Sequence, residues 1–298
     1  MLNECPQAEL AGVVDLVPDR ASAAAAQFGC PAYGNHVDLA GKADAAIVAV
    51  PTSAHASVGC DLMEAGLDVL VEKPIAPDRE AARRLIDTAE RHGRILMIGH
   101  LERFNPAVMA LKAIARHPLF FEIHRMSLFS PRSLDIDVVL DLMIHDLDIV
   151  LDLVGQPPEE VRAAGISVLS GKVDIANVRL AFRTGCIANL TASRVSTERV
   201  RKLRLFQPSE YVSLDYSRQE AAAFAVQEGQ KIDFRMLPIE KGEPLKIEVS
   251  HFLDCVAERR TPAVSGADGL RALEAALDIL AKIEEHAQLV ERQLKSIQ

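Results

Sequence analysis

Short apolar runs alternate with helical stretches over the first hundred residues, and this alternation constrains the fold more than any other feature. The run Ala45–Val50 is uninterrupted, as in a strand buried on both faces of a parallel sheet. Strand, helix, strand in this rhythm predicts βαβ units and an α/β, doubly wound Rossmann-type domain over residues 1–101. The expected strands are Leu10–Leu16, Ala45–Val50, Asp68–Val71 and Arg94–Gly99, and the expected helices are Pro18–Phe28, Ser53–Ala65 and Asp78–His92.

The pattern changes after Gly99. Between residues 161 and 225 several strand-length segments follow one another with turn signals between them, and helical spacing flanks them on both sides. This order predicts an α+β second domain, residues 102–298, built on a largely antiparallel sheet. The expected helices are Pro106–His117, Val138–Leu153, Leu245–Arg259 and Gly266–Leu289, and the expected strands are Phe120–Leu128, Val161–Leu169, Asn177–Phe182, Ile187–Ser193, Lys202–Phe206 and Tyr211–Tyr216.

Charge and cysteine content narrow the class of protein. The formal net charge is −9, which argues against nucleic acid as the main partner, because phosphate binding requires a basic face. No apolar run approaches the roughly 18 residues of a membrane span, and no signal peptide is visible. The five cysteines are scattered and form no Cys-x-x-Cys pair, so we expect reduced thiols, a cytoplasmic location and no metal site.

Asp15 ends the first expected strand. In a dinucleotide fold an acid there accepts hydrogen bonds from the adenosine ribose hydroxyls and repels a 2′-phosphate, which favours NAD over NADP. The alternative is a helix N-cap or a surface acid. Nothing before Asp15 supplies the strand, glycine-rich turn and helix that usually receive the pyrophosphate, so we expect the native gene to start upstream, the recorded chain being a fragment or having a misassigned start.

The segment Glu72-Lys73-Pro74 follows an apolar strand at the edge where open α/β sheets bind ligands. A lysine there can accept a hydroxyl proton if burial or a neighbouring positive charge lowers its pKa. The alternative is an ordinary loop lysine before a helix.

In the expected helix Val138–Leu153, the residues Asp141, His145, Asp148 and Asp152 are spaced to share one face. Carboxylates one turn from a histidine favour its charged form and orient its ring, which suits proton transfer. A solvated acidic face is the alternative. One histidine with carboxylates and no nearby cysteine argues against a zinc site.

Arg103 lies in the junction His100–Pro106 and is a natural contact for phosphate or carboxylate. Arg132 and Arg194 also lie near motif segments, and we expect at least one of the three arginines to meet an anionic substrate group. The alternatives are an interdomain linker and surface arginines in exposed salt bridges.

These motifs together resemble the Gfo/Idh/MocA oxidoreductases, and the resemblance runs from Asp15 to the helix Gly266–Leu280. Its most specific parts are Glu72-Lys73-Pro74 and the Asp141-x-x-x-His145 helix, in this order and about 70 residues apart. The resemblance implies that Lys73 and His145 are the catalytic pair, assisted by Asp141. It also implies a set of cofactor-lining residues, namely Val50, Pro51, Thr52, His55, Glu72 and Lys73.

Within the family, the stretches His100–Pro106, Asp137–Asp148 and Ala192–Arg194 look most like UDP-N-acetylglucosamine 3-dehydrogenases. This likeness implies a sugar-nucleotide substrate contacted by Lys73, Arg103, Asn105, Arg132, Asp141, His145 and Arg194, with NAD as cofactor and a homo-oligomer formed through the sheet of the second domain. Inositol or aldose dehydrogenase activity is the alternative within the family. A non-catalytic sugar or dinucleotide sensor is disfavoured because a sensor needs neither Lys73 nor His145. The sequence leaves open which of these two is the primary base, which sugar carbon is oxidised, and the oligomer size.

Overall fold

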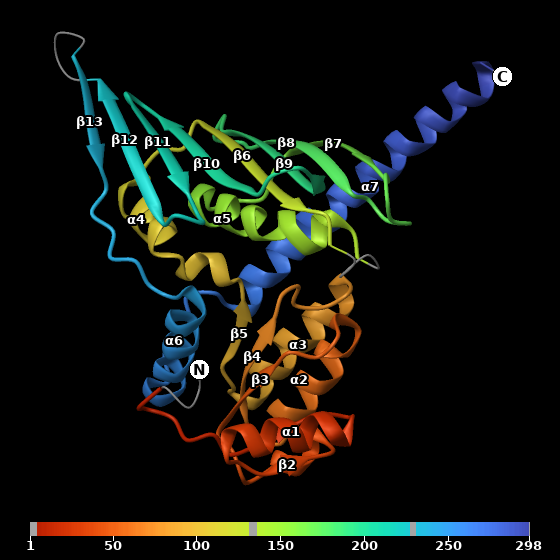
Figure 1. Ribbon diagram of the computed structural model, residues 1–298, viewed down its shortest axis with the longest axis vertical. Helices are drawn as coiled ribbons and strands as arrows, with labels where there is room; N and C mark the ends of the chain where they lie inside the picture. Colours follow the sequence, from red (N-terminus) through yellow and green to blue (C-terminus); the bar gives the residue numbers. More distant parts are fainter. Residues whose placement is uncertain (1–4, 131–135, 227–230, 298) are drawn as a thin grey trace. The chain divides into compact units, whose positions relative to one another are not determined.

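The computed structural model describes residues 5–130, 136–226 and 231–297 (Figure 1). The chain forms two compact units. Unit 1 comprises residues 1–100 and 243–270, and unit 2 comprises residues 101–242 and 271–298. The sequence predicts domains 1–101 and 102–298, whereas unit 1 ends at residue 100 and also includes residues 243–270.

Unit 1 contains parallel strands in two separate sheets. Strands β3, β4 and β5 form one sheet in that order, and β1 pairs with β2 in the other. In the described part of the chain, β1 and β3 are not hydrogen-bonded to each other. The short β2 was not predicted. The strands are β1 (Val13–Val14), β2 (Ala32–Tyr33), β3 (Ala45–Val48), β4 (Asp68–Glu72) and β5 (Leu96–Gly99).

The helices of this Rossmann-type unit begin and end at the expected signals. Asp78 caps α3 by accepting a hydrogen bond from the Ala81 amide at 2.8 Å, and Gly93 ends the helix at φ 59°. Helix α1 has Pro18 in its first turn and ends at Gly29, φ 67°. The helices are α1 (Pro18–Phe28), α2 (His55–Glu64) and α3 (Arg79–His92).

Helix α6 (Pro244–Glu258) joins unit 1 through contacts at its C-terminal end. Arg259 pairs with Asp68 at the start of β4 and donates to the carbonyl of Gly93 at 2.7 Å. The next segment extends the sheet, because the Ile98 amide donates to the Val264 carbonyl at 3.0 Å. These long-range contacts explain the membership of residues 243–270 in unit 1, and sequence order alone does not reveal them.

Unit 2 is built on one eight-stranded sheet in the order β13-β12-β11-β10-β6-β9-β8-β7. Every neighbouring pair is antiparallel except β6 with β9, which confirms the predicted largely antiparallel sheet. Strands β12 and β13 were not predicted as separate elements. The strands are β6 (Phe120–Leu128), β7 (Glu160–Ile166), β8 (Ile175–Ala181), β9 (Ile187–Ser196), β10 (Val200–Gln207), β11 (Glu210–Asp215), β12 (Glu220–Val226) and β13 (Ile232–Met236).

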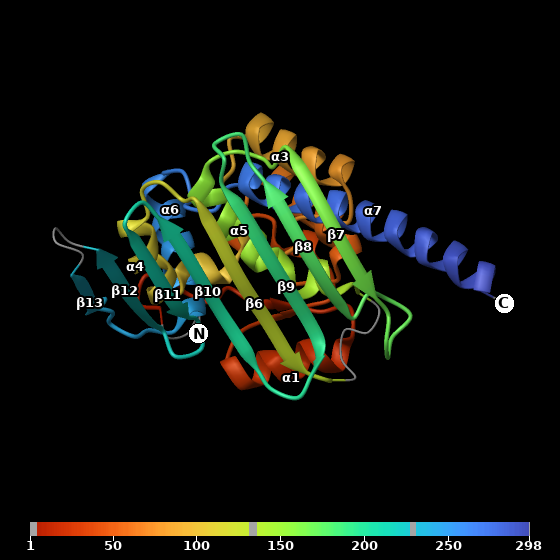
Figure 2. The same ribbon diagram turned by 90° about the horizontal axis from the view of Figure 1, so that it is seen from above.

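Helices cover one face of this sheet, and Figure 2 looks onto the other face, where the strands lie in front of the helices. The covered face carries the core of unit 2, in which Phe121 and Leu203 from the sheet are fully buried with Leu147 and Ile279 from the helices. The helices are α4 (Pro106–Ile114), α5 (Ile144–Val154) and α7 (Gly266–Ile297), of which residues 271 onward belong to unit 2. No helix within the described ranges combines the length and apolarity that a membrane crossing requires.

Candidate functional site

The Lys73 turn follows β4 directly. The Glu72 side chain turns back so that its Oε2 accepts a hydrogen bond from the Lys73 amide at 3.3 Å. The Lys73–Pro74 peptide is cis, and Ile75 and Ala76 beyond it are fully buried. The turn is therefore anchored on both sides of Lys73, whose residue is itself half-buried.

His55 joins this turn to the loop after β3. Its Nδ1 lies 2.8 Å from the Pro74 carbonyl oxygen and its Nε2 lies 2.9 Å from the Val50 carbonyl oxygen, and the residue is 1% exposed. Backbone carbonyls thus occupy both ring nitrogens, so His55, one of the residues expected to line the cofactor, positions the two loops. Val50 and Pro51 are exposed and Thr52 is half-buried, which leaves this loop accessible to a ligand.

Asp15 follows β1 and serves as a turn residue. Its Oδ1 accepts a hydrogen bond from the Val17 amide at 2.8 Å, immediately before α1 begins at Pro18. This is a local turn contact ahead of the helix, and the N-cap position itself is Val17, so Asp15 is not the N-cap of α1. Oδ2 makes no hydrogen bond within the described residues, so one carboxylate oxygen remains available to accept from a ribose hydroxyl.

Unit 1 presents accessible groups at the strand ends where such folds bind a dinucleotide. Asp15 offers an acceptor at the carboxyl end of β1, and the exposed Val50-Pro51 loop and Lys73 lie at the carboxyl ends of β3 and β4, where such folds bind ligands. The described residues ahead of Asp15 contain no glycine-rich turn, so they supply no cradle for the pyrophosphate. Among the side chains that the structure describes, no three His, Cys, Asp or Glu residues are grouped to hold a metal ion.

In unit 2, Asp141 and His145 lie on either side of a change in helix type. A π-helical turn, Val139–Met143, precedes α5, and the Asp141 amide donates to the Asp137 carbonyl at 3.0 Å. Such wide turns occur often at functional sites because they shift side chains out of the regular helical spacing. Both residues are half-buried, so part of each remains accessible to a ligand.

The predicted acidic face divides into parts with different partners. Asp148 holds Arg103 in a bidentate pair, with Oδ2 at 2.6 Å from Nε and Oδ1 at 2.9 Å from Nη2. Asp152 lies 2.8 Å from Nη1 of the same arginine and 2.6 Å from Nζ of Lys112. The Arg103 side chain is 6% exposed, so this guanidinium holds α5 in place and is not presented to solvent as an anion contact.

A second buried charge network includes Asp146, the residue after His145. Arg125 on β6 donates to Asp146 at 2.7 and 2.9 Å and to Glu102 at 2.9 Å. Burial opposes the charge on Arg125, but the neighbouring Asp146 carboxylate outweighs it and raises the pKa of the guanidinium well above its usual value. Sequence reasoning missed this network, because no local spacing links positions 102, 125 and 146.

Asn105 is part of the same network and of the local chain geometry. Its Nδ2 donates to Glu102 and to the Tyr216 carbonyl, each at 3.1 Å, while its Oδ1 caps α4 by accepting from the Ala107 amide. With the residue 3% exposed, its amide is fully used inside unit 2. Asn105, which is expected to contact the substrate, thus has its amide engaged in contacts of its own unit.

The other arginines near the motif segments differ in burial and in their partners. Arg194 is 5% exposed, donates to the Ile136 carbonyl and lies 3.9 Å from Asp174. Arg132 lies outside the described residues. Arg201 on β10, which sequence reasoning missed, is the cross-strand partner of Arg125, is half-buried, and has no ion pair or side-chain hydrogen bond with any described residue. Burial and the nearby Arg125 charge lower the pKa of Arg201.

Comparisons with known proteins agree with these two units. A family model described as "Oxidoreductase family, NAD-binding Rossmann fold" matches residues 1–100, and one for the GFO/IDH/MocA C-terminal domain matches residues 110–206. A UDP-N-acetylglucosamine 3-dehydrogenase from Acidithiobacillus ferrooxidans is 36% identical over 286 residues, covering 94% of this chain and 91% of that protein. An inositol 2-dehydrogenase from Rhizobium meliloti is 26% identical over 95% of this chain and 91% of its own length.

Solved structures of related oxidoreductases also share the fold of this chain. The crystal form of the Acidithiobacillus ferrooxidans enzyme superimposes with a TM-score of 0.88 at 37% identity, covering 93% of this chain and 90% of that chain. An aldose–aldose oxidoreductase from Caulobacter crescentus, at 24% identity and a TM-score of 0.80, shares the fold over 96% of this chain and 92% of its own. The chain belongs to the Gfo/Idh/MocA family of NAD-dependent oxidoreductases that act on sugar hydroxyl groups.

Proposed function

We propose that this enzyme oxidises a hydroxyl group of UDP-N-acetylglucosamine or a closely related sugar nucleotide. The observation that carries the proposal is the 36% identity, over 94% of the chain, to a protein named UDP-N-acetylglucosamine 3-dehydrogenase. The inositol 2-dehydrogenase relative is 26% identical, so inositol oxidation is the less supported alternative.

In the proposed reaction Lys73 accepts the proton of the sugar hydroxyl. NAD, when bound, supplies the acceptor for the hydride that leaves the same carbon. The anchored turn supports this role, because general-base catalysis requires an amine held within hydrogen-bonding reach of the proton that it takes.

His145 is proposed to hydrogen-bond the reacting oxygen or to relay its proton, with Asp141 orienting the imidazole. The π-helical turn beside His145 supports the assignment, as does the half-buried position of both residues. Which of Lys73 and His145 takes the proton first is distinguished by the pH dependence of turnover in the Lys73→Met and His145→Asn variants.

For the diphosphate of the substrate we propose Arg201 as a contact. Carboxylates already bind Arg103, and Arg194 is buried against a carbonyl, whereas the half-buried Arg201 lies beside a second arginine. The planar guanidinium can donate two hydrogen bonds to phosphate oxygens, and the negative charge of a diphosphate would offset the repulsion between the two arginines. Arg201→Ala is expected to raise the KM for the sugar nucleotide about tenfold and to leave the KM for NAD unchanged.

The substrate test measures formation of reduced cofactor from NAD. UDP-N-acetylglucosamine, free N-acetylglucosamine, myo-inositol and an aldose are supplied separately at equal concentration, and the oxidised carbon is read from the NMR spectrum of the product. Turnover confined to the sugar nucleotide supports the proposal. Faster turnover of inositol or of the free aldose overturns it, and no turnover with any of the four indicates a sensor.

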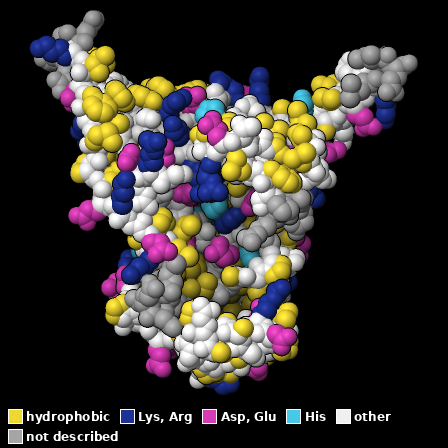
Figure 3. Space-filling view, viewed as in Figure 1, with side chains coloured by type: hydrophobic (Ala, Val, Ile, Leu, Met, Phe, Trp, Pro, Cys, Tyr) yellow, Lys and Arg dark blue, Asp and Glu magenta, His cyan; other side chains and the backbone are white. Residues whose placement is uncertain are grey.

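We also propose that two copies of the chain associate through the uncovered face of the unit 2 sheet. A row of aromatic rings crosses this face, with neighbouring ring centroids 4.8 to 5.7 Å apart, and Figure 3 shows yellow hydrophobic side chains gathered over the region of β11 to β13. The rings belong to Phe120, Phe206, Tyr211, Phe224 and Phe234.

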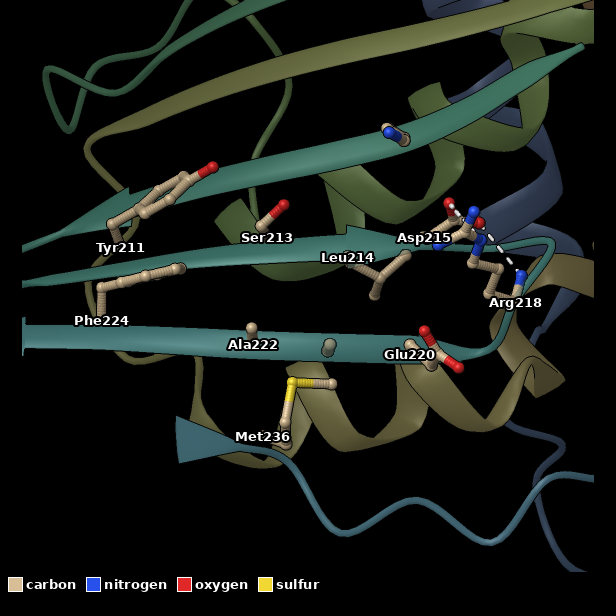
Figure 4. A pocket seen from close by; sticks show the side chains of 11 residues that line it. Tyr211, Ser213, Leu214, Asp215, Arg218, Glu220, Ala222, Phe224 and Met236 are labelled. Carbon is tan, nitrogen blue, oxygen red and sulfur yellow. Dashed lines mark hydrogen bonds and ion pairs between the residues drawn. The ribbon is translucent and has the colours of Figure 1, made fainter. Parts of the chain in front are cut away.

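The surroundings of this row support a second copy as the occupant. A pocket of about 300 Å³ lies between Tyr211, Phe224 and Met236, with Asp215 and Arg218 at its other end (Figure 4). Paired charges of both signs flank the apolar row, as in Arg204 with Glu122 at 2.9 Å, and a face with both signs can be complementary to itself across a two-fold axis. Light scattering should show a dimer or larger assembly that Phe234→Asp shifts to monomer, and a monomeric wild type would refute the interface.

The cysteines support a reducing compartment such as the cytoplasm. All five are free thiols, and burial raises the pKa of the Cys186 thiol to about 11. Fluorescence microscopy of cells that produce the protein with a fluorescent tag checks the location, and fluorescence confined to the cytoplasm is the expected result.

A further inference from the structure

Unit 1 holds a buried acid that the proposed reaction does not use. Glu248 lies on α6, on the same side as the buried residues Val249, Phe252 and Cys255. The residue is 1% exposed, and its Oε1 is shielded from solvent and makes no hydrogen bond with the described residues. A carboxyl group in such a place requires a reason, because burying an unpaired charge costs far more than burying an apolar side chain.

The charged group that acts on Glu248 is another carboxylate. Of the described charged groups, Glu72 on β4 is the one whose field reaches it, and no described cation offsets that field. Burial first, and then the charge of Glu72, raise the pKa of Glu248 to about 8. Glu248 is therefore a neutral acid at pH 7.

Glu72 in turn is the residue that anchors the Lys73 turn. Its Oε2 accepts from the Lys73 amide at 3.3 Å, and its side chain lies over Gly99, where an added Cβ would come within 3.1 Å of that oxygen. Gly99 is the register partner of Glu72 on β5, so the sheet itself leaves room for this carboxylate. Within unit 1, the Glu72 carboxylate thus acts on Glu248 through its charge and on Lys73 through a hydrogen bond.

We propose that Glu248 is a positioning residue that acts on Lys73 through Glu72, and this rests on the proposed role of Lys73 as proton acceptor. While Glu248 is neutral, Glu72 carries the negative charge beside the lysine turn. When Glu248 ionises, a second negative charge strengthens the hold of Lys73 on its own proton and pushes the Glu72 carboxylate away. The pair therefore limits proton acceptance by Lys73 on the alkaline side.

The Glu248 proton makes the stability of the folded protein depend on pH. The folded protein keeps the Glu248 proton up to about pH 8, whereas an unfolded chain releases it near pH 4.5. Because the folded state binds more protons in this window, stability decreases as the pH rises from about 4.5 to about 8. Glu248→Gln, which is always neutral, lacks this decrease.

The first measurement compares thermal melts of wild type, Glu248→Gln and Glu258→Gln from pH 5 to pH 9. Glu258 is a matched control, since it lies on the same helix but is exposed and pairs with Arg260 at 2.7 Å. We expect the melting temperature of Glu248→Gln to increase relative to that of the wild type as the pH rises, by roughly 5 °C at pH 9. The difference in melting temperature between Glu258→Gln and the wild type should not change with pH. A difference in melting temperature between Glu248→Gln and the wild type that does not change with pH overturns the proposal.

The second measurement follows the Lys73 amine without using activity. Lysines are reductively methylated with ¹³C-formaldehyde, the Lys73 resonance is assigned by its loss in Lys73→Met, and its titration is followed by NMR. We expect its midpoint in Glu248→Gln to lie roughly half a pH unit below that in the wild type. An unmoved midpoint overturns the proposal even if the melts behave as expected.

Turnover provides the link to the reaction. Glu248→Gln is expected to shift the kcat–pH profile in the same direction as the Lys73 midpoint and to leave the KM for the sugar nucleotide within twofold. If no sugar is turned over by the wild type, the proposed function fails while the melts and the NMR titration still decide the role of Glu248.

Discussion

The two units bury charge in opposite ways. In unit 2, Arg125 is enclosed with two carboxylates, Asp146 at 2.7 Å and Glu102 at 2.9 Å, so its charge is compensated. In unit 1, Glu248 is enclosed beside a like charge, Glu72, and no described cation compensates it. The first arrangement raises the pKa of the Arg125 guanidinium and keeps it charged, whereas the second raises the pKa of Glu248 to about 8 and keeps that carboxyl neutral at pH 7.

This difference indicates different roles. A compensated network resists any change of charge and holds elements together, here η4 (Leu101–Phe104), β6 and α5. An uncompensated acid decreases stability above its unfolded-state pKa, so its presence next to the lysine turn suggests a chemical benefit. Substitutions in the two units should therefore separate loss of stability from loss of turnover.

The largest effect is expected for Arg125→Met. Removing this guanidinium leaves Asp146 and Glu102 buried without their counter-charge, which should lower the free energy of unfolding by about 3–5 kcal/mol. Urea denaturation measures the loss. The matched control is Arg204→Met on the same sheet, whose side chain is 40% exposed and pairs with Glu122, and it should cost less than about 1 kcal/mol. Equal losses for the two variants would show that the buried network does not hold unit 2.

The next effect is on turnover and should leave stability unchanged. Lys73→Met keeps the length of the side chain but removes the proton acceptor, so kcat should fall by about 10²-fold or more, or roughly 2.7 kcal/mol in the activation barrier. The urea midpoint should match that of the wild type. Normal turnover in this variant would show that another residue is the base, and His145 would be the first candidate to test.

These two variants also show which parts of the site could be predicted from sequence. The lysine turn is local, since an apolar strand followed by Glu72, Lys73 and Pro74 determines both its place in the sheet and its exposure. The helix ends at Gly29 and Gly93 are local too, because glycine readily adopts the left-handed conformation found there. Local chemistry of this kind is readable without a structure.

The partners of the buried charges were not readable in this way. Their spacing places Asp148 and Asp152 on one acidic face with His145. In the structure, however, Asp148 pairs with Arg103, which lies 45 residues away in the sequence. Glu248 sits in an ordinary amphipathic helix, and its neighbour Glu72 is remote in sequence. The membership of α6 in unit 1 has the same cause, since pairing between distant segments leaves no periodic signal in either one.

The smallest of the three effects concerns cofactor choice and would refine the assignment of unit 1. The Asp15 carboxylate already uses Oδ1 to cap the turn at Val17, so one oxygen remains for the ribose and the negative charge remains to repel a 2′-phosphate. The wild type should therefore prefer NAD over NADP in kcat/KM. Asp15→Ser keeps a capping oxygen while removing the charge, and it should narrow that preference about tenfold, or roughly 1.4 kcal/mol. Asp19→Ser, a change at an exposed acid in the first turn of the same helix, is the control and should leave the ratio unchanged. A wild type that prefers NADP, or a ratio that moves equally in both variants, would mean that Asp15 acts only in the turn before α1.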